Sequence, residues 1–178
     1  MRNTIVLYKS HYGSTQQYAT WISEALEADH ESLDTFDFDR LDPYSTVIYG
    51  GGLYAVGMLG IKTLKKHAER LKGKHLILFA VGLSSADQET VKTIESANAQ
   101  GPFEGVPFFY FRGKMDFEAL KFKHKVMMRM LAKKVSSKKE PLTEDEMGIL
   151  SCIEKPVDMV DRALIAPLLD HMGKRRLP

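Results

Sequence analysis

Short runs of apolar residues alternate along this chain with longer segments in which apolar residues recur every three or four positions. Apolar runs of this kind predict strands, and amphipathic segments predict helices. The predicted strands are 5–8, 31–37, 46–49, 75–81 and 106–111, and the predicted helices are 16–26, 58–71, 87–98, 114–135 and a last one that starts at Pro156. Residues 136–146 are expected to form a polar loop.

The alternation of strands and helices predicts the fold class. Strands that are separated by helices form parallel sheets with right-handed crossovers. Five strands in a chain of 178 residues suit a three-layer, doubly wound α/β fold with the strand order 2-1-3-4-5. We expect residues 1–178 to form one domain, with an extra basic helix after the fifth strand in an insertion at about 114–153.

Composition excludes several classes of protein. No apolar run reaches the roughly eighteen residues of a membrane span, and the first apolar run is too short for the core of a signal peptide. The single cysteine, Cys152, excludes an internal disulfide and thiolate clusters of zinc or iron, so no metal site is expected. We therefore expect a cytoplasmic protein, with Cys152 as a partly buried, inert thiol.

Charge is distributed unevenly. The net charge of the chain is +2, but between Arg112 and Lys139 ten basic residues stand against two acidic ones, a local charge of +8. This stretch is either a solvated helix face or a surface for an acidic partner or for the inner face of a membrane. The candidate contact residues are Lys121, Lys123, Lys125 and Lys133. Nucleic acid is not expected as a partner, because few aromatic residues lie between the charges.

The first predicted strand ends in a loop that is rich in hydroxyl groups. This loop contains Ser10, Tyr12, Ser14 and Thr15 around Gly13 and leads directly into a helix. A phosphate at a helix N-terminus meets N–H groups that have no intrahelical partner, and the helix dipole favours its negative charge. The loop therefore predicts a phosphate site. The alternative is that Ser14 or Thr15 only caps the helix.

Two further strands end in a similar way. The strand at 46–49 leads into the segment Gly50-Gly51-Gly52-Leu53-Tyr54, and the strand at 75–81 leads into Gly82-Leu83-Ser84. In the predicted strand order, these ends and the phosphate loop meet at the carboxyl edge of the sheet, where open α/β sheets bind ligands. The sequence therefore predicts one ligand site built from three loops.

These three loops resemble the flavin mononucleotide loops of the flavodoxins. Flavodoxins carry a hydroxyl-x-hydroxyl-Gly-x-Thr phosphate loop, and this chain has Ser10, Tyr12, Gly13 and Thr15 at those positions, with tyrosine in place of the usual threonine. The resemblance implies an FMN cofactor, with Tyr54 covering one face of the flavin ring. The implied cofactor-binding residues are Ser10, Tyr12, Gly13, Ser14, Thr15, Gly51, Gly52, Leu53, Tyr54, Gly82, Leu83 and Ser84.

Within this superfamily the chain is similar to the menaquinone-dependent protoporphyrinogen IX dehydrogenases. The similarity lies in the segment from Lys65 to Leu71 and in a fifth strand that leads into a basic helix with several methionines. It implies an oxidoreductase that passes electrons from protoporphyrinogen IX to a quinone. Two alternatives stay open: an electron carrier between protein partners, and a regulatory or binding module without flavin. Carrier flavodoxins tend to be acidic, whereas the pI of this chain is about 8.5.

Overall fold

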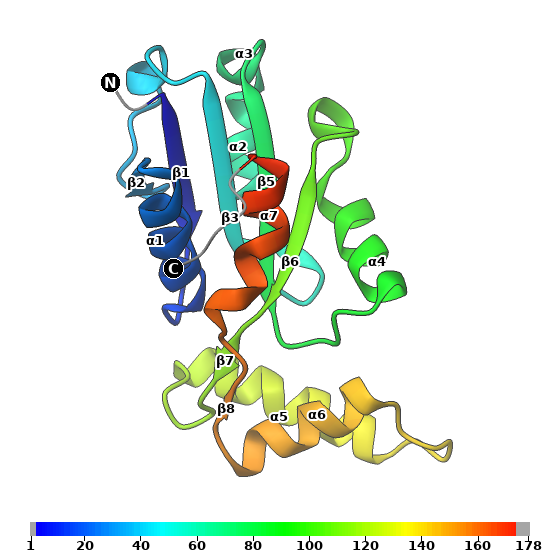
Figure 1. The fold of residues 1–178 in the computed structure, drawn as a ribbon. Coiled ribbons are helices and arrows are strands. Elements are labelled where there is room, and N and C mark those ends of the chain that lie inside the picture. The colour runs from blue at the N-terminus through cyan, green and yellow to red at the C-terminus, as the bar shows by residue number, and fades with distance from the viewer. Residues whose placement is uncertain (1–2, 174–178) are drawn as a thin grey trace.

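The computed structural model describes residues 3–173 and contains a twisted parallel sheet with helices on both faces (Figure 1). The sheet order is β2-β1-β3-β5-β6, and each neighbouring pair is parallel. Its strands are β1 (Thr4–Lys9), β2 (Asp29–Ser32), β3 (Thr46–Tyr54), β5 (His75–Gly82) and β6 (Phe108–Arg112). The two-residue strand β4 (Gly57–Met58) pairs with the end of β3 and runs antiparallel to it. The expected order of the five main strands is confirmed.

The helices form the two outer layers. One face of the sheet carries α1 (Ser14–Leu26) and α7 (Ala166–His171), and the other carries α2 (Ile61–Lys66), α3 (Ala68–Leu71) and α4 (Gln88–Asn98) (Figure 1). The 3-10 helices η1 (Phe38–Leu41), η2 (Gly101–Phe103) and η3 (Arg162–Ile165) lie in the connections. Asp87 caps α4, because its carboxylate accepts from the backbone N–H of Thr90 at 2.8 Å.

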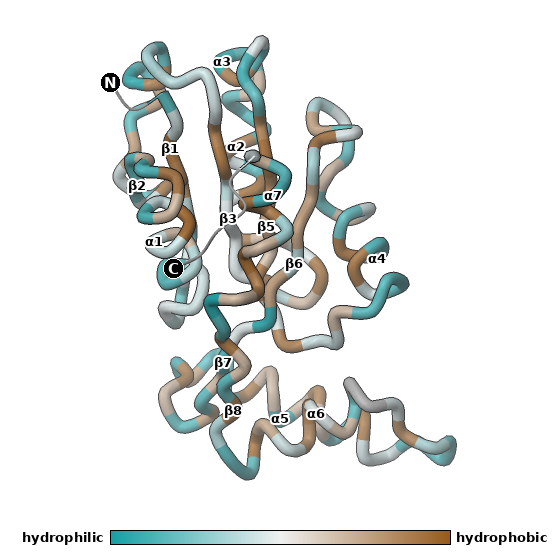
Figure 2. Tube along the Cα trace, viewed as in Figure 1, coloured by the Kyte–Doolittle hydropathy of each residue, from teal (hydrophilic) through white to brown (hydrophobic). Residues whose placement is uncertain are grey.

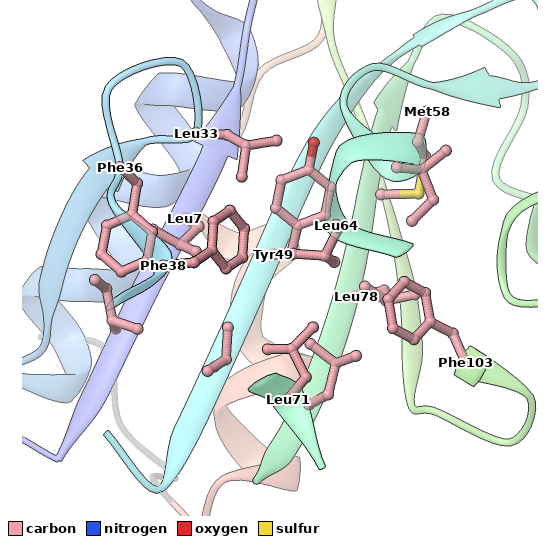
Figure 3. Packing of buried hydrophobic residues seen from close by; sticks show 14 of the residues in the cluster. Leu7, Leu33, Phe36, Phe38, Tyr49, Met58, Leu64, Leu71, Leu78 and Phe103 are labelled. Carbon is pink, nitrogen blue, oxygen red and sulfur yellow. The ribbon is translucent and has the colours of Figure 1, made fainter. Parts of the chain in front are cut away.

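The core follows the two-residue period of the strands. Ile5 and Leu7 of β1 belong to the cluster under α2, whereas Val6 between them belongs to the cluster under α1. Figure 3 shows the first cluster, in which Tyr49 and Phe38 pack between the sheet and the helices. Both faces of the central strands are therefore buried, which explains why these strands read as almost continuous apolar runs.

A separate small unit lies beyond the carboxyl edge of the sheet (Figure 1). It consists of α5 (Phe122–Ser136) and α6 (Glu144–Glu154), framed by β7 (Lys114–Met115) and β8 (Val157–Asp158), which pair antiparallel. We call it the insertion. The predicted basic helix is confirmed as α5, but it starts eight residues later than expected, since the chain first forms β7. Cys152 is buried in α6, and burial raises the pKa of its thiol.

The predictions for the end of the chain were partly wrong. The expected polar loop at 136–146 already contains the start of α6, where Thr143 and Glu146 form a capping box. No helix starts at Pro156, because residues 157–158 pair with β7. Pro167 lies in the first turn of α7 and does not bend a longer helix, as proline lacks the N–H that this turn leaves without a partner.

Three other predicted boundaries differ as well. The second strand is shorter and lies earlier than 31–37, since the chain turns after Ser32. The predicted helix at 58–71 is divided into α2 and α3 at His67, whose ring stacks on Phe38 at 3.8 Å between ring centroids. The three glycines after Tyr49 do not form a loop, because β3 continues through them to Tyr54.

Candidate functional site

The carboxyl ends of β1, β3 and β5 enclose one cavity of about 300 Å³. The cavity is lined by ten of the twelve residues predicted to bind the cofactor, together with residues of the insertion. The ten are Ser10, Tyr12, Ser14, Thr15, Gly52, Leu53, Tyr54, Gly82, Leu83 and Ser84. The structure thus brings the three predicted loops together at the predicted edge of the sheet.

The phosphate loop turns sharply into α1. Gly13 precedes the helix with φ of 91°, a left-handed conformation that favours glycine, and its N–H donates to Ser10 Oγ at 3.0 Å. Gly13 itself does not line the cavity, so it shapes the turn. The N–H groups of Ser14, Thr15 and the residue after them lie in the first helical turn, where no intrahelical acceptor exists. They form a ready set of uncharged donors for an anion.

The hydroxyls of Ser14 and Thr15 are buried beside this turn. Ser14 Oγ accepts from the backbone N–H of Lys114 at 3.2 Å, which ties the insertion to the loop. Thr15 faces β3: a Cβ placed on Gly52 would lie 3.2 Å from Thr15 Oγ1. Any side chain at position 52 would therefore crowd the Thr15 hydroxyl.

The loop after β5 is held by the end of β6. Gly82 O accepts from the backbone N–H of Gly113 at 2.7 Å, and Leu83 O accepts from the Arg112 guanidinium at 3.1 Å. A further bond runs from the Tyr110 hydroxyl to Ser84 O at 2.9 Å. These carbonyls are held by hydrogen bonds from β6 and the residue after it, so this wall of the cavity is set by the sheet.

The end of β3 carries Tyr54 to the mouth of the cavity. After Tyr54 the chain reverses through Ala55, at φ of 55°, into β4. Gly51 lies inside β3 and does not line the cavity: a Cβ there would meet Leu59 O at 2.8 Å, so this glycine permits close backbone packing. Tyr54 lines the cavity and is 37% exposed.

The insertion covers the cavity, which the sequence did not indicate. One side of α5 lines it through His124, Met127, Met128 and Leu131, and Leu120 before this helix and Ile149 of α6 line it too. These α5 side chains belong to the apolar stripe that the sequence showed, with His124 in its middle. The histidine inside the apolar stripe was the sequence signal for a functional residue. The stripe alone did not show which part of the protein it faces.

His124 joins three aromatic rings of the site. Its Nδ1 is hydrogen-bonded to the Tyr12 hydroxyl, and its ring lies 5.4 Å from the Tyr54 ring and 5.8 Å from the His11 ring, between centroids. Met127 adds a second contact, because its sulfur accepts from the Tyr54 hydroxyl at 2.8 Å. The insertion is thus attached to both the phosphate loop and the end of β3.

The surroundings of His11 in the phosphate loop disfavour its protonated form. Burial lowers the pKa of His11, and the nearby His124, Lys121 and Lys9 lower it further, whereas Asp34 opposes this shift. Within residues 3–173, no group of three histidine, cysteine or carboxylate side chains is placed to bind a metal ion.

None of the described helices has the length and apolar character that are needed to cross a bilayer.

Comparisons with known proteins agree with this architecture. A family model of the flavodoxin domain matches residues 5–141. Among curated proteins, none matches the chain.

Several flavodoxins are among the solved structures to which this chain is similar. A flavodoxin from the domain Archaea is 20% identical over 63% of this chain and 85% of its own, with a TM-score of 0.40. Flavodoxin from Megasphaera elsdenii is 18% identical over 60% and 82%, with a TM-score of 0.42. Flavodoxin 2 from Bacillus cereus is 17% identical over 85% and 93%, with a TM-score of 0.44.

The family match covers well over half of the chain, and it includes β1, β3 and β5, whose ends enclose the cavity. With its parallel sheet in the order expected for this fold, the chain belongs to the flavodoxin-domain family.

Proposed function

We propose that this chain binds flavin mononucleotide in the cavity at the carboxyl edge of the sheet and acts as a redox protein. The observation that supports this proposal most directly is the composition of the cavity. One end presents uncharged N–H and hydroxyl donors at the start of α1, and the other end is lined mainly by apolar and aromatic side chains. FMN has the same division between a phosphate and a flat ring system.

The phosphate end of the cavity offers enough hydrogen-bond donors for a phosphate group without a lysine. The N–H groups of the first turn of α1, the Thr15 hydroxyl and the Ser10 hydroxyl are available as donors beside Gly13. These residues would hold the phosphate.

The ring end fits a planar apolar group. Leu53, Leu83 and Met128 contribute apolar surface, and Tyr54 offers an aromatic face. A volume of about 300 Å³ is at the lower end of the range for sites that bury small ligands. When bound, the flavin supplies one- and two-electron transfer, and the role of the chain is to hold it, shield it from water and tune its potential.

The helix α5, which covers the cavity, favours a small molecule over another protein as the redox partner. Because α5 lies across the cavity, a large protein would not reach the ring end directly, which favours a small molecule as the redox partner. We therefore propose an oxidoreductase, and the similarity to protoporphyrinogen dehydrogenases suggests a porphyrinogen donor and a quinone acceptor. The basic character of the insertion also distinguishes the chain from acidic carriers.

One observation favours a different function. His124 and Met127 of the chain itself contact Tyr12 and Tyr54, the residues that are expected to meet the cofactor. A module that keeps the fold without flavin would use such contacts to close the site. In that case the cavity would bind no flavin.

A titration separates these functions. Adding FMN to the purified protein should quench flavin fluorescence and raise the melting temperature, and riboflavin, which lacks the phosphate, should bind at least tenfold more weakly. If neither ligand quenches or stabilises, the flavin proposal fails. If FMN binds, anaerobic mixing with protoporphyrinogen IX should bleach the flavin and menaquinone should restore it; a flavin that stays oxidised would contradict the donor assignment only.

A further inference from the structure

The outer surface of α5 carries large apolar side chains among cations. Phe122 is 80% exposed, Met130 69% and Val126 40%. The three residues are spaced four apart, which places them in one row along the helix. The cavity-lining residues of α5 lie on its other side. The residues of this apolar row therefore do not line the cavity.

Cations flank this row, and no acidic residue occurs in α5. Lys121, Lys123, Lys133 and Lys134 are exposed along it. Lys125 contributes less than the sequence indicated, because its ammonium pairs with Glu118 at 2.8 Å and its side chain is only 22% exposed. The row and the flanking lysines form what we call the outer face of α5.

The position of this face on the molecule is also distinctive. The insertion projects beyond the carboxyl edge of the sheet, away from the bulk of the domain (Figure 1). Figure 2 shows hydrophobic and hydrophilic segments interleaved along α5 and α6, whereas β1 and β5 are mostly hydrophobic and lie inside the domain. The exposed side chains of the outer face therefore belong to the part of the chain that projects from the domain.

We propose that the outer face of α5 docks on an anionic phospholipid bilayer. Phenylalanine, valine and methionine side chains that protrude from a helix insert between lipid headgroups, and lysines on either side interact with lipid phosphates while their alkyl stems cover apolar surface. The alternative occupant of this face is an acidic protein, which would also attract the lysines. Charge attraction to such a protein does not require the row of protruding apolar side chains, whereas insertion into a bilayer does.

Docking in this orientation places α5 between the bilayer and the cavity. The opposite sides of a helix are about 10 Å apart, so the cavity would lie close to the lipid surface. The docking itself does not depend on bound flavin, because its residues do not line the cavity. It can therefore be tested separately from the proposed function.

The experiment is co-sedimentation of the full chain with vesicles, with and without added FMN. The vesicles are mixed phosphatidylglycerol and phosphatidylcholine in one set and phosphatidylcholine alone in the other. We expect binding to the anionic set and at least tenfold weaker binding to the neutral set. Phe122→Ser with Met130→Ser should weaken anionic binding at least tenfold, and Lys123→Glu with Lys133→Glu should do the same.

The matched controls are substitutions of the same kinds, lysine to glutamate and apolar residue to serine, made outside the insertion. Lys62→Glu with Lys66→Glu on α2 should leave vesicle binding within twofold of wild type, and so should Val56→Ser in the β3–β4 turn. Absence of binding to anionic vesicles would overturn the proposal. Binding that high salt abolishes and that the serine variants do not weaken would also overturn it, because the charges alone would then account for the binding.

Discussion

The Tyr12 hydroxyl is hydrogen-bonded to Nδ1 of His124, 112 positions further along the chain. The same hydroxyl accepts from the backbone N–H of Lys121 at 3.4 Å. Tyr12 belongs to the phosphate loop, and His124 belongs to the first turns of α5. The position at which flavodoxins usually have threonine is therefore used here to attach the insertion to the site.

Removing this attachment should loosen α5 without affecting the sheet. Tyr12→Phe keeps the ring and deletes the hydroxyl, and a hydrogen bond of this kind contributes about 1 kcal/mol. We expect amide hydrogen exchange at 121–128 to become about fivefold faster, while β1 and β5 stay unchanged as an internal standard. Unchanged exchange at 121–128 would show that the bond does not hold the insertion.

The Thr15 hydroxyl should matter for FMN binding and little for stability. Thr15→Val keeps the shape and removes a donor to a charged phosphate, a bond that contributes about 1.5–3 kcal/mol. We expect the Kd for FMN to rise at least tenfold, measured by fluorescence quenching. Thr20→Val is the matched control, because the Thr20 hydroxyl only donates to Gln16 O on the same helix. Equal effects of the two variants would contradict a phosphate role for Thr15.

Alanine substitutions at two glycines of β3 should have different effects, one on stability and the other on FMN binding. A Cβ on Gly50 would lie 2.0 Å from the Phe79 ring, so Gly50→Ala should lower the free energy of unfolding by about 1–3 kcal/mol through overpacking. Gly52→Ala should be nearly neutral for stability but weaken FMN binding about tenfold, since its methyl group would crowd Thr15 Oγ1. Denaturant unfolding and FMN titration of both variants test this division. Gly52→Ala with wild-type affinity would contradict it.

The protein should lose stability in alkali partly through Tyr49. Burial raises the pKa of this tyrosine above its usual value, and its hydroxyl donates to Leu59 O. The stabilisation is complete below about pH 10, where unfolded tyrosine ionises, and is lost as the pH rises above it. Tyr49→Phe should be less stable at pH 7 because Leu59 O loses its donor, but its stability should fall less steeply above pH 10. Parallel curves for the two proteins would contradict this explanation.

The sequence alone determined most of the domain. Apolar runs of strand length predicted β1, β3, β5 and β6, because a strand that is buried on both faces has no polar side. The loop chemistry around Gly13 and Gly82 predicted an edge where three strand ends meet, since parallel strands place their carboxyl ends together. The capping box of Thr143 and Glu146 would have predicted α6 as well, because this signal is local.

What the basic helix faces depends on contacts between distant parts of the chain. The stripe around His124 and the row around Phe122 are both apolar in sequence, and nothing local distinguishes the side that closes a cavity from the side that is exposed. The choice depends on contacts between residues more than a hundred positions apart, such as Tyr12 with His124. For the same reason the sequence could not separate Gly52, which lines the cavity, from Gly51, which packs against Leu59 in the strand. The pattern of apolar residues in a helix or strand shows which of its sides is buried. Which other element packs against that side depends on how the whole chain folds.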